Sequence, residues 1–143
     1  LTLKAASVGK TLEWYKELGS TAAAYTPNAE DTDGFTHSFI GRLPVTSAAN
    51  TLAAAELKNG RFVVVVETSY KGTANVDAFK IYGLDTGLEL SEMTQSSNEN
   101  SGSLLFTLST REGTYEKFPY VIYQDLDYAT AAAEFAANFT TVI

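Results

Sequence analysis

The feature that most constrains this chain is a short run of β-branched residues near its middle. Phe62 and the four consecutive valines at 63–66 lie between Gly60 and Gly72. Valine favours extended backbone. An unbroken apolar run predicts a strand covered on both faces, because a half-exposed strand would alternate apolar and polar side chains. We therefore expect residues 61–68 to be the central strand of a sheet.

The stretch that follows has the pattern of a hairpin. Apolar and polar side chains alternate over residues 77–84 and again over residues 87–94, which is the period of a strand. Residues 85–87, Asp-Thr-Gly, have the composition of a reversing loop. The pattern predicts that these two strands pair with each other. The later stretch 96–102 has no apolar side chain and predicts a solvated loop.

Three further strands follow from the same alternation. They are expected over residues 35–42, 103–110 and 117–124. In the last of these, Phe118, Tyr120 and Ile122 share the face that we expect to be buried. Pro119 has no N–H group, which favours a position at the edge of a sheet.

Two segments have a helical pattern. Ser47 is a suitable N-cap for a short internal helix that ends near Leu57, and Asp127 for a C-terminal helix over residues 128–138. The second helix has apolar residues at three- and four-residue spacing, which suits packing on a sheet. They are Tyr128, Ala131, Ala132, Phe135 and Phe139. Residues 11–18 fit a strand or a helix, and we favour a strand that stops at Gly19.

Together these elements predict one α+β domain over residues 1–143. We expect mainly antiparallel β-sheet, sandwich or barrel-like, with one short internal helix and a C-terminal helix. A chain of this length suits a single core. Residues 1–10 are predicted to be an extended N-terminal arm that could add to the sheet of a neighbouring subunit, the alternative being a frayed terminus.

Composition argues against several classes of partner. The chain has 10 Lys and Arg against 17 Asp and Glu, a net charge of −7, so we expect no nucleic-acid contact. No run of about twenty apolar residues is present, so we expect no membrane partner. There is no cysteine and only one histidine. Thiolate chemistry and a histidine-rich metal cluster are therefore excluded.

Two short motifs imitate ligand-binding loops. Gly9-Lys10-Thr11 resembles the end of a phosphate-binding loop, but Lys4 occupies the position that needs the first glycine. The acidic residues at 30–34, Glu-Asp-Thr-Asp-Gly, resemble half of a calcium loop, although the later glutamate of an EF-hand is absent. We favour a solvated loop for residues 30–34 and leave open whether it binds a cation.

Catalytic residues are not evident either. His37 lies between Phe35 and Phe39 at an inward-facing position, with no nucleophile motif near it in the sequence. We expect a structural histidine. Glu89 and Glu92 are expected on the outer face of the hairpin. The sequence thus predicts no enzyme, no cofactor, and no catalytic, cofactor-binding or metal-binding residue.

Residues 59–139 carry a family resemblance. The succession Asn-Gly-Arg-Phe-Val-Val-Val-Val-Glu-Thr at 59–68, Tyr-Lys-Gly at 70–72 and Tyr-Gly-Leu-Asp-Thr-Gly-Leu at 82–88 is one part of it. Glu-Asn at 99–100 and Asp-Tyr-Ala-Thr at 127–130 complete it. This pattern resembles small virion structural proteins of tailed bacteriophages, and the residues before 59 do not contribute to it.

The resemblance implies a subunit of a capsid, neck or tail assembly, located in the virion and assembled in the host cytoplasm. Its partners would be copies of itself and other virion structural proteins. The composition agrees with a non-enzymatic subunit of a repeated homo-oligomeric array. The alternative is a monomeric β-rich surface module that binds a glycan or a peptide, since several tyrosines are expected near strand ends and loops.

Overall fold

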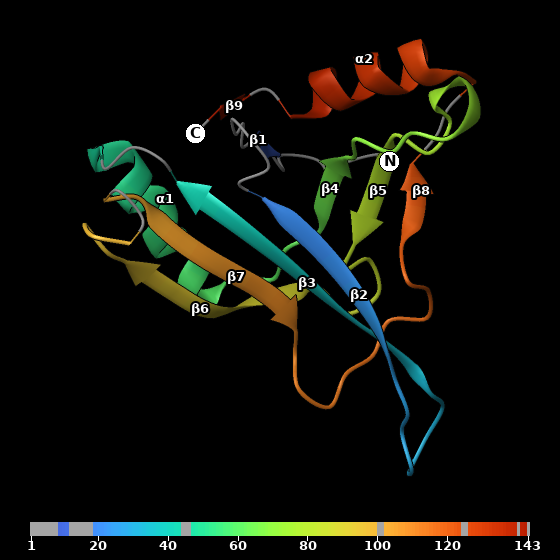
Figure 1. Cartoon of the computed structure of the whole chain (residues 1–143), viewed down its shortest axis with the longest axis horizontal. Coiled ribbons are helices and arrows are strands. Elements are labelled where there is room, and N and C mark those ends of the chain that lie inside the picture. The colour runs from blue at the N-terminus through green and yellow to red at the C-terminus, as the bar shows by residue number, and fades with distance from the viewer. Residues whose placement is uncertain are drawn as a thin grey trace.

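The computed structural model describes residues 9–11, 19–43, 47–99, 102–123, 126–139 and 141–142, and has an α+β fold. Two antiparallel sheets and two α-helices make up most of the described part, so the predicted fold class is confirmed (Figure 1). The larger sheet has the strand order β2-β3-β7-β6 and the smaller one β4-β5-β8. The larger sheet comprises β2 (Ser20–Thr26), β3 (Gly34–Leu43), β6 (Leu88–Gln95) and β7 (Leu104–Thr110). The smaller sheet comprises β4 (Val64–Glu67), β5 (Phe79–Tyr82) and β8 (Val121–Tyr123).

Both helices begin where their capping residues predict. Ser47 accepts a hydrogen bond from the Asn50 N–H (3.1 Å) at the start of α1 (Ala48–Glu56). Asp127 accepts one from the Thr130 N–H (2.8 Å) at the start of α2 (Tyr128–Asn138). Such caps satisfy backbone donors that the first helical turn leaves without partners. Short 3₁₀ turns, η1 (Leu57–Asn59) and η2 (Thr73–Asn75), follow α1 and β4.

The apolar side chains form two cores that share the smaller sheet. The first core lies between the two sheets and α1, and the second between the smaller sheet and α2. In the second core the rings of Phe79 and Phe135 stack at 5.0 Å between centroids, as the spacing of the C-terminal helix predicts. The buried members of the first core are Phe39, Leu43, Ala54, Tyr82, Leu88, Phe106 and Leu108, and those of the second Ala78, Phe79, Ile81, Tyr123 and Ala131.

The valine run occupies a different place from the one its sequence predicts. It forms β4, which among the described strands pairs with β5 alone and is an edge strand, so the prediction of a central strand is wrong. The expected cover on both faces is nevertheless present in part. Val64 and Val66 pack against the first core, whereas Val65 packs against the second. An unbroken apolar run therefore indicates that both faces of a strand are covered. It does not indicate that the strand has a neighbouring strand on each side.

The predicted hairpin over residues 77–94 is also wrong in its pairing. The chain reverses as expected, with the Gly87 N–H donating to the Gly83 carbonyl (3.1 Å). However, β5 and β6 belong to different sheets. Gly83 has φ +73°, and a Cβ there would lie 2.6 Å from Leu88 Cγ. This glycine lets the chain leave one sheet and enter the other at close range.

The strand near Pro119 is short, and its buried face is the opposite of the predicted one. β8 lies at the edge of its sheet, as the proline predicts. It contacts the second core through Val121 and Tyr123, whereas Phe118, Tyr120 and Ile122 are exposed. The predicted buried face is therefore wrong by one residue, because α2 covers the opposite side of β8 and a one-residue change reverses a strand's faces.

The remaining strand predictions divide into confirmed ones and untested ones. β3 and β7 confirm the strands expected over 35–42 and 103–110, and the polar stretch 96–102 joins β6 to β7. The predicted strand over 11–18 and the arm over 1–10 fall mostly outside the described residues. At their described ends, β1 (Lys10–Thr11) pairs in parallel with β9 (Thr141–Val142) of the same chain.

Candidate functional site: the β2–β3 hairpin

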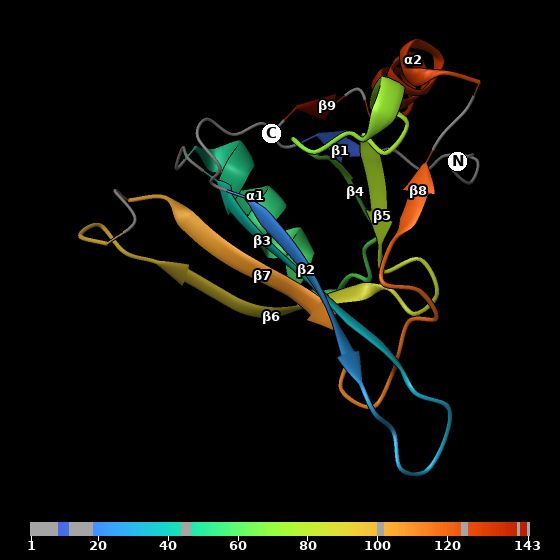
Figure 2. The ribbon, with the colours of Figure 1, turned by 45° about the vertical axis from the view of Figure 1, so that its right-hand side comes forward.

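The most distinctive part of the described surface is a long hairpin that extends beyond its own sheet. β2 and β3 pair from Ser20↔Ile40 to Thr26↔Gly34, but β3 pairs with β7 only from Ser38 onward. The far half of the hairpin thus projects past β7 as a ribbon (Figures 1 and 2). Isolated two-stranded ribbons are marginally stable in water, so this one depends on the contacts that β3 makes beyond β7 and on the bonds within the tip.

The outer strand of the hairpin is uncovered. Among the described strands, β2 pairs with β3 alone, and five of its seven residues are exposed. Its sequence, Ser-Thr-Ala-Ala-Ala-Tyr-Thr, has no charged residue, proline or bulge. Proteins commonly use these features to block pairing at an exposed edge. The main-chain groups on the outer side of β2 are therefore available to pair with another strand.

The tip is ordered by its own side chains. The Tyr25 hydroxyl donates to one carboxylate oxygen of Asp33, and the Asn28 N–H donates to the other (2.8 Å). The Tyr25 ring also meets the Phe35 ring edge-on, with centroids 6.1 Å apart. The hydrogen bonds from Tyr25 and Asn28 hold the pKa of Asp33 below its usual value, and the bond to Asp33 raises the pKa of Tyr25.

These bonds bear on the acidic residues at 30–34. Both carboxylate oxygens of Asp33 already accept hydrogen bonds from the loop, and Asp31 accepts one from the Thr32 N–H (2.7 Å). Across the described part of the chain, no three His, Cys, Asp or Glu side chains are grouped so that they could hold a metal ion. We therefore assign Asp31 and Asp33 to the structure of the loop.

A buried glutamate fastens β3 close to the tip end of the hairpin. Glu116 is 3% exposed. Its carboxylate accepts hydrogen bonds from the Asp85 N–H (2.9 Å), the Thr86 N–H (2.9 Å) and the Thr86 hydroxyl (2.7 Å). Its main chain exchanges two 2.9 Å hydrogen bonds with Phe35 of β3. One residue thus joins the hairpin to the turn between β5 and β6, with donors that satisfy a buried charge.

The close approach at this point requires a glycine. Gly34 begins β3, and a Cβ at this position would lie 2.4 Å from Tyr115 Cβ. Any other residue would push the 115–116 segment away from β3 and strain the main-chain bonds between Glu116 and Phe35.

His37 makes a second connection beside Glu116. Its Nδ1 accepts a hydrogen bond from the Gly83 N–H (3.1 Å), and its Nε2 lies 2.8 Å from the Phe118 carbonyl oxygen. An N–H can only donate and a carbonyl can only accept, so the proton is on Nε2. The ring also meets Tyr82 edge-on at 5.4 Å between centroids. Both ring nitrogens are engaged with backbone, as expected for a structural histidine.

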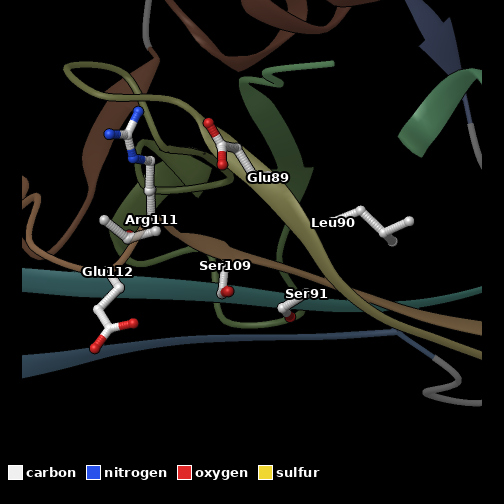
Figure 3. Close-up of a pocket in the computed structure, with 7 residues that line it drawn as sticks. Glu89, Leu90, Ser91, Ser109, Arg111 and Glu112 are labelled. Atoms are coloured by element: carbon white, nitrogen blue, oxygen red, sulfur yellow. The ribbon is translucent and has the colours of Figure 1, made fainter. Parts of the chain in front are cut away.

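The other residues considered from the sequence lie apart from Glu116 and His37. Glu89 forms an ion pair with Arg61 (3.1 Å), and Glu92 lies beyond an irregularity in β6. A hollow of about 320 Å³ beside β6 is lined by Glu89, Ser91, Ser109 and neighbours. Among the charged side chains around it, Glu112 points away from Glu89 and Arg111 (Figure 3). It therefore lacks the convergent polar groups of a binding site.

Sequence reasoning missed a polar hollow at the loop between β4 and β5. This hollow of about 610 Å³ is lined by residues 69–73, Asn75 and Asp77. The Tyr70 side chain there is 81% exposed. Ala74 and Asn75 have positive φ values of 55° and 60°, which non-glycine residues seldom adopt. In the sequence, residues 71–75 have the composition of an ordinary turn, so nothing in the pattern indicates this hollow.

Lys71 fastens this loop to α2. Its ammonium group lies 2.5 Å from the Glu67 carboxylate and 5.0 Å from the centre of the Tyr128 ring, and the Tyr128 hydroxyl donates to Glu67 (2.7 Å). The hydrogen bond from Lys71 lowers the pKa of Glu67, and the same bond raises the pKa of Lys71. The lysine at the rim of the hollow is therefore already engaged.

Comparison with known proteins adds no relative. No protein-family model, curated protein or solved structure matches the chain. Neither described helix has the length and apolar character that a membrane span requires.

Replacing Glu116 by glutamine tests whether its carboxylate fastens β3 to the turn between β5 and β6. The amide NH₂ of Glu116→Gln would face backbone N–H donors, so we expect the free energy of unfolding to fall by about 1–3 kcal/mol. Urea denaturation measures this change. The matched control is Glu112→Gln at an exposed position four residues earlier, which should change stability by less than about 0.5 kcal/mol. Equal stability of both variants would contradict the assignment.

The bond between Tyr25 and Asp33 predicts a pH dependence of the tip. A carboxyl whose folded pKa is depressed stabilises the folded tip above the ordinary value of 3.8, and this contribution is lost as the pH falls through the folded pKa. We expect an NMR titration of the Asp33 carboxyl carbon to have its midpoint below 3.8. Tyr25→Phe should raise the midpoint toward 3.8, whereas Tyr70→Phe should leave it unchanged. An Asp33 midpoint that Tyr25→Phe does not move would refute the role of this bond.

Proposed function

We propose that this protein is a non-enzymatic structural subunit that assembles with copies of itself into a repeated array, as in the capsid, neck or tail of a tailed bacteriophage. The observation that carries the proposal is the projecting β2–β3 hairpin, whose outer strand is uncharged and has no second partner among the described strands. The virion would be its location, with assembly in the host cytoplasm, and other virion structural proteins would be further partners.

An uncovered edge of this kind favours association. Each outward N–H and C=O group of β2 can form a ladder hydrogen bond with an added strand. Such an edge is a hazard for a protein that works as a monomer, which is why monomers usually block it with charge, proline or a bulge. The absence of these features in β2 is understandable if the edge is covered in the working assembly.

The way the hairpin is attached also supports a role in assembly. Glu116 and His37 join β3, in the half of the hairpin that extends past β7, to the turn between β5 and β6 at the side of the smaller sheet. A subunit that must present a strand to a neighbour benefits from a fixed orientation, because ordering a loose hairpin on binding costs conformational entropy. The engagement of both His37 ring nitrogens with backbone favours a structural over a catalytic role for this residue.

A second candidate function rests on the polar hollow at the β4–β5 loop. Tyr70 offers an exposed aromatic ring, and Asn75 and Asp77 offer polar groups beside it. Sugars are commonly bound by an aromatic face flanked by hydrogen-bonding side chains. A surface module that binds a glycan would need this combination, so the hollow supports a glycan-binding module as the second candidate.

Mass in solution separates the two candidates. Sedimentation velocity over a range of protein concentrations, followed by electron microscopy of the heaviest species, should show particles many times the 15.4 kDa of one chain. Rings, tubes or shells are the expected forms. A chain that stays monomeric at every concentration and binds oligosaccharides, with binding lost in Tyr70→Ala, would overturn the proposal in favour of the glycan module.

A further inference from the structure

We infer that β2 pairs antiparallel with β2 of a second copy of this chain, around a two-fold axis at Ala23. The inference rests on the proposed function, since it specifies one contact of the self-assembly. It would join two four-stranded sheets into one continuous sheet of eight strands. The following features of the described strands select this partner and this direction.

The other sheet edges are poorly suited to accept β2. β6 has two glutamates and an irregular register between Leu90 and Glu92, and its first residue is already bridged to Phe62. These three features hinder strand addition. At the edges of the smaller sheet, β4 has four residues and β8 has three, with Pro119 close before β8. Among the described strands, β2 is therefore the best match for another β2.

Charge selects the antiparallel direction. The tip of each hairpin has three acidic residues, Glu30, Asp31 and Asp33, in a chain of net charge −7. Parallel pairing would place the two tips side by side. Antiparallel pairing about Ala23 places them at opposite ends, roughly 40 Å apart at about 3.3 Å per residue. This separation is several times the Debye length of about 8 Å at physiological salt, so the tips would not repel each other appreciably.

Register follows from the length of the strand. Only an axis at the middle residue, Ala23, pairs all seven residues of β2 with their counterparts. Thr21 then lies opposite Tyr25 of the second copy, which is a favourable pairing of a β-branched with an aromatic side chain. Ala22 lies opposite Ala24, and Ala23 lies opposite itself. A shift in either direction loses ladder pairs at the ends.

The chain has no cysteine, so single cysteines can report this register. Opposing residues of an antiparallel pair have Cα atoms about 4.5–5.5 Å apart, within the range that a disulfide spans. Under mild oxidation Ala23→Cys should therefore form a covalent dimer. Thr21→Cys and Tyr25→Cys should each dimerise poorly alone and efficiently when mixed. Ser97→Cys, in the exposed loop between β6 and β7, is the control for random collisions.

The expected result is a dimer yield for Ala23→Cys, and for the mixture, at least roughly tenfold above that of Ser97→Cys, because only opposing pairs meet the distance requirement. Unchanged thermal unfolding of each reduced variant confirms that the fold is intact.

Wild-type protein is sedimented in parallel to detect self-association. If the wild type assembles but Ala23→Cys dimerises no better than Ser97→Cys, the β2 pairing is overturned and the proposed function stands. Efficient dimerisation of Thr21→Cys alone would likewise overturn the antiparallel register. A wild type that stays monomeric overturns both proposals.

Discussion

The buried carboxylate of Glu116 is the interaction on which the arrangement of the two sheets and the hairpin depends. It is held by three donors from the turn between β5 and β6, while its main chain is paired with Phe35 of β3. A buried carboxylate without donors would be costly, so the turn and the 115–116 segment must stay together. His37 links the same turn to β3 a short distance away. The cores supply most of the stability, and these polar bonds fix the direction in which the hairpin leaves the body.

Local sequence patterns predicted the elements well but not their partners. Ser47 and Asp127 marked the starts of both helices, and alternation located β3 and β7. Which strands would pair was not encoded locally. The turn at residues 83–87 has the composition of a hairpin loop, yet Gly83 directs the chain into another sheet. The faces of β8 were misassigned because α2, which covers one of them, lies later in the chain.

The features of the candidate site were hidden in the sequence for physical reasons. Glu116 lies in a polar stretch where a glutamate is normally exposed, and nothing nearby indicates that backbone donors from residues 85 and 86 surround it. The open edge of β2 was missed because its row of alanines gives no alternation. In the structure that same sequence is informative. Five of the seven residues of β2 are exposed, none of the seven is charged, and none belongs to either core.

The central claim is that the uncovered side of β2 becomes covered when the protein assembles. Hydrogen–deuterium exchange of the backbone amides tests it most directly, in dilute protein and in the assembled state. The account predicts that exchange over residues 20–26 slows on assembly, because the outward N–H groups of β2 acquire partners, whereas β7, which is paired on both sides in the monomer, changes little. Equal exchange of residues 20–26 in the dilute and assembled protein would contradict the account.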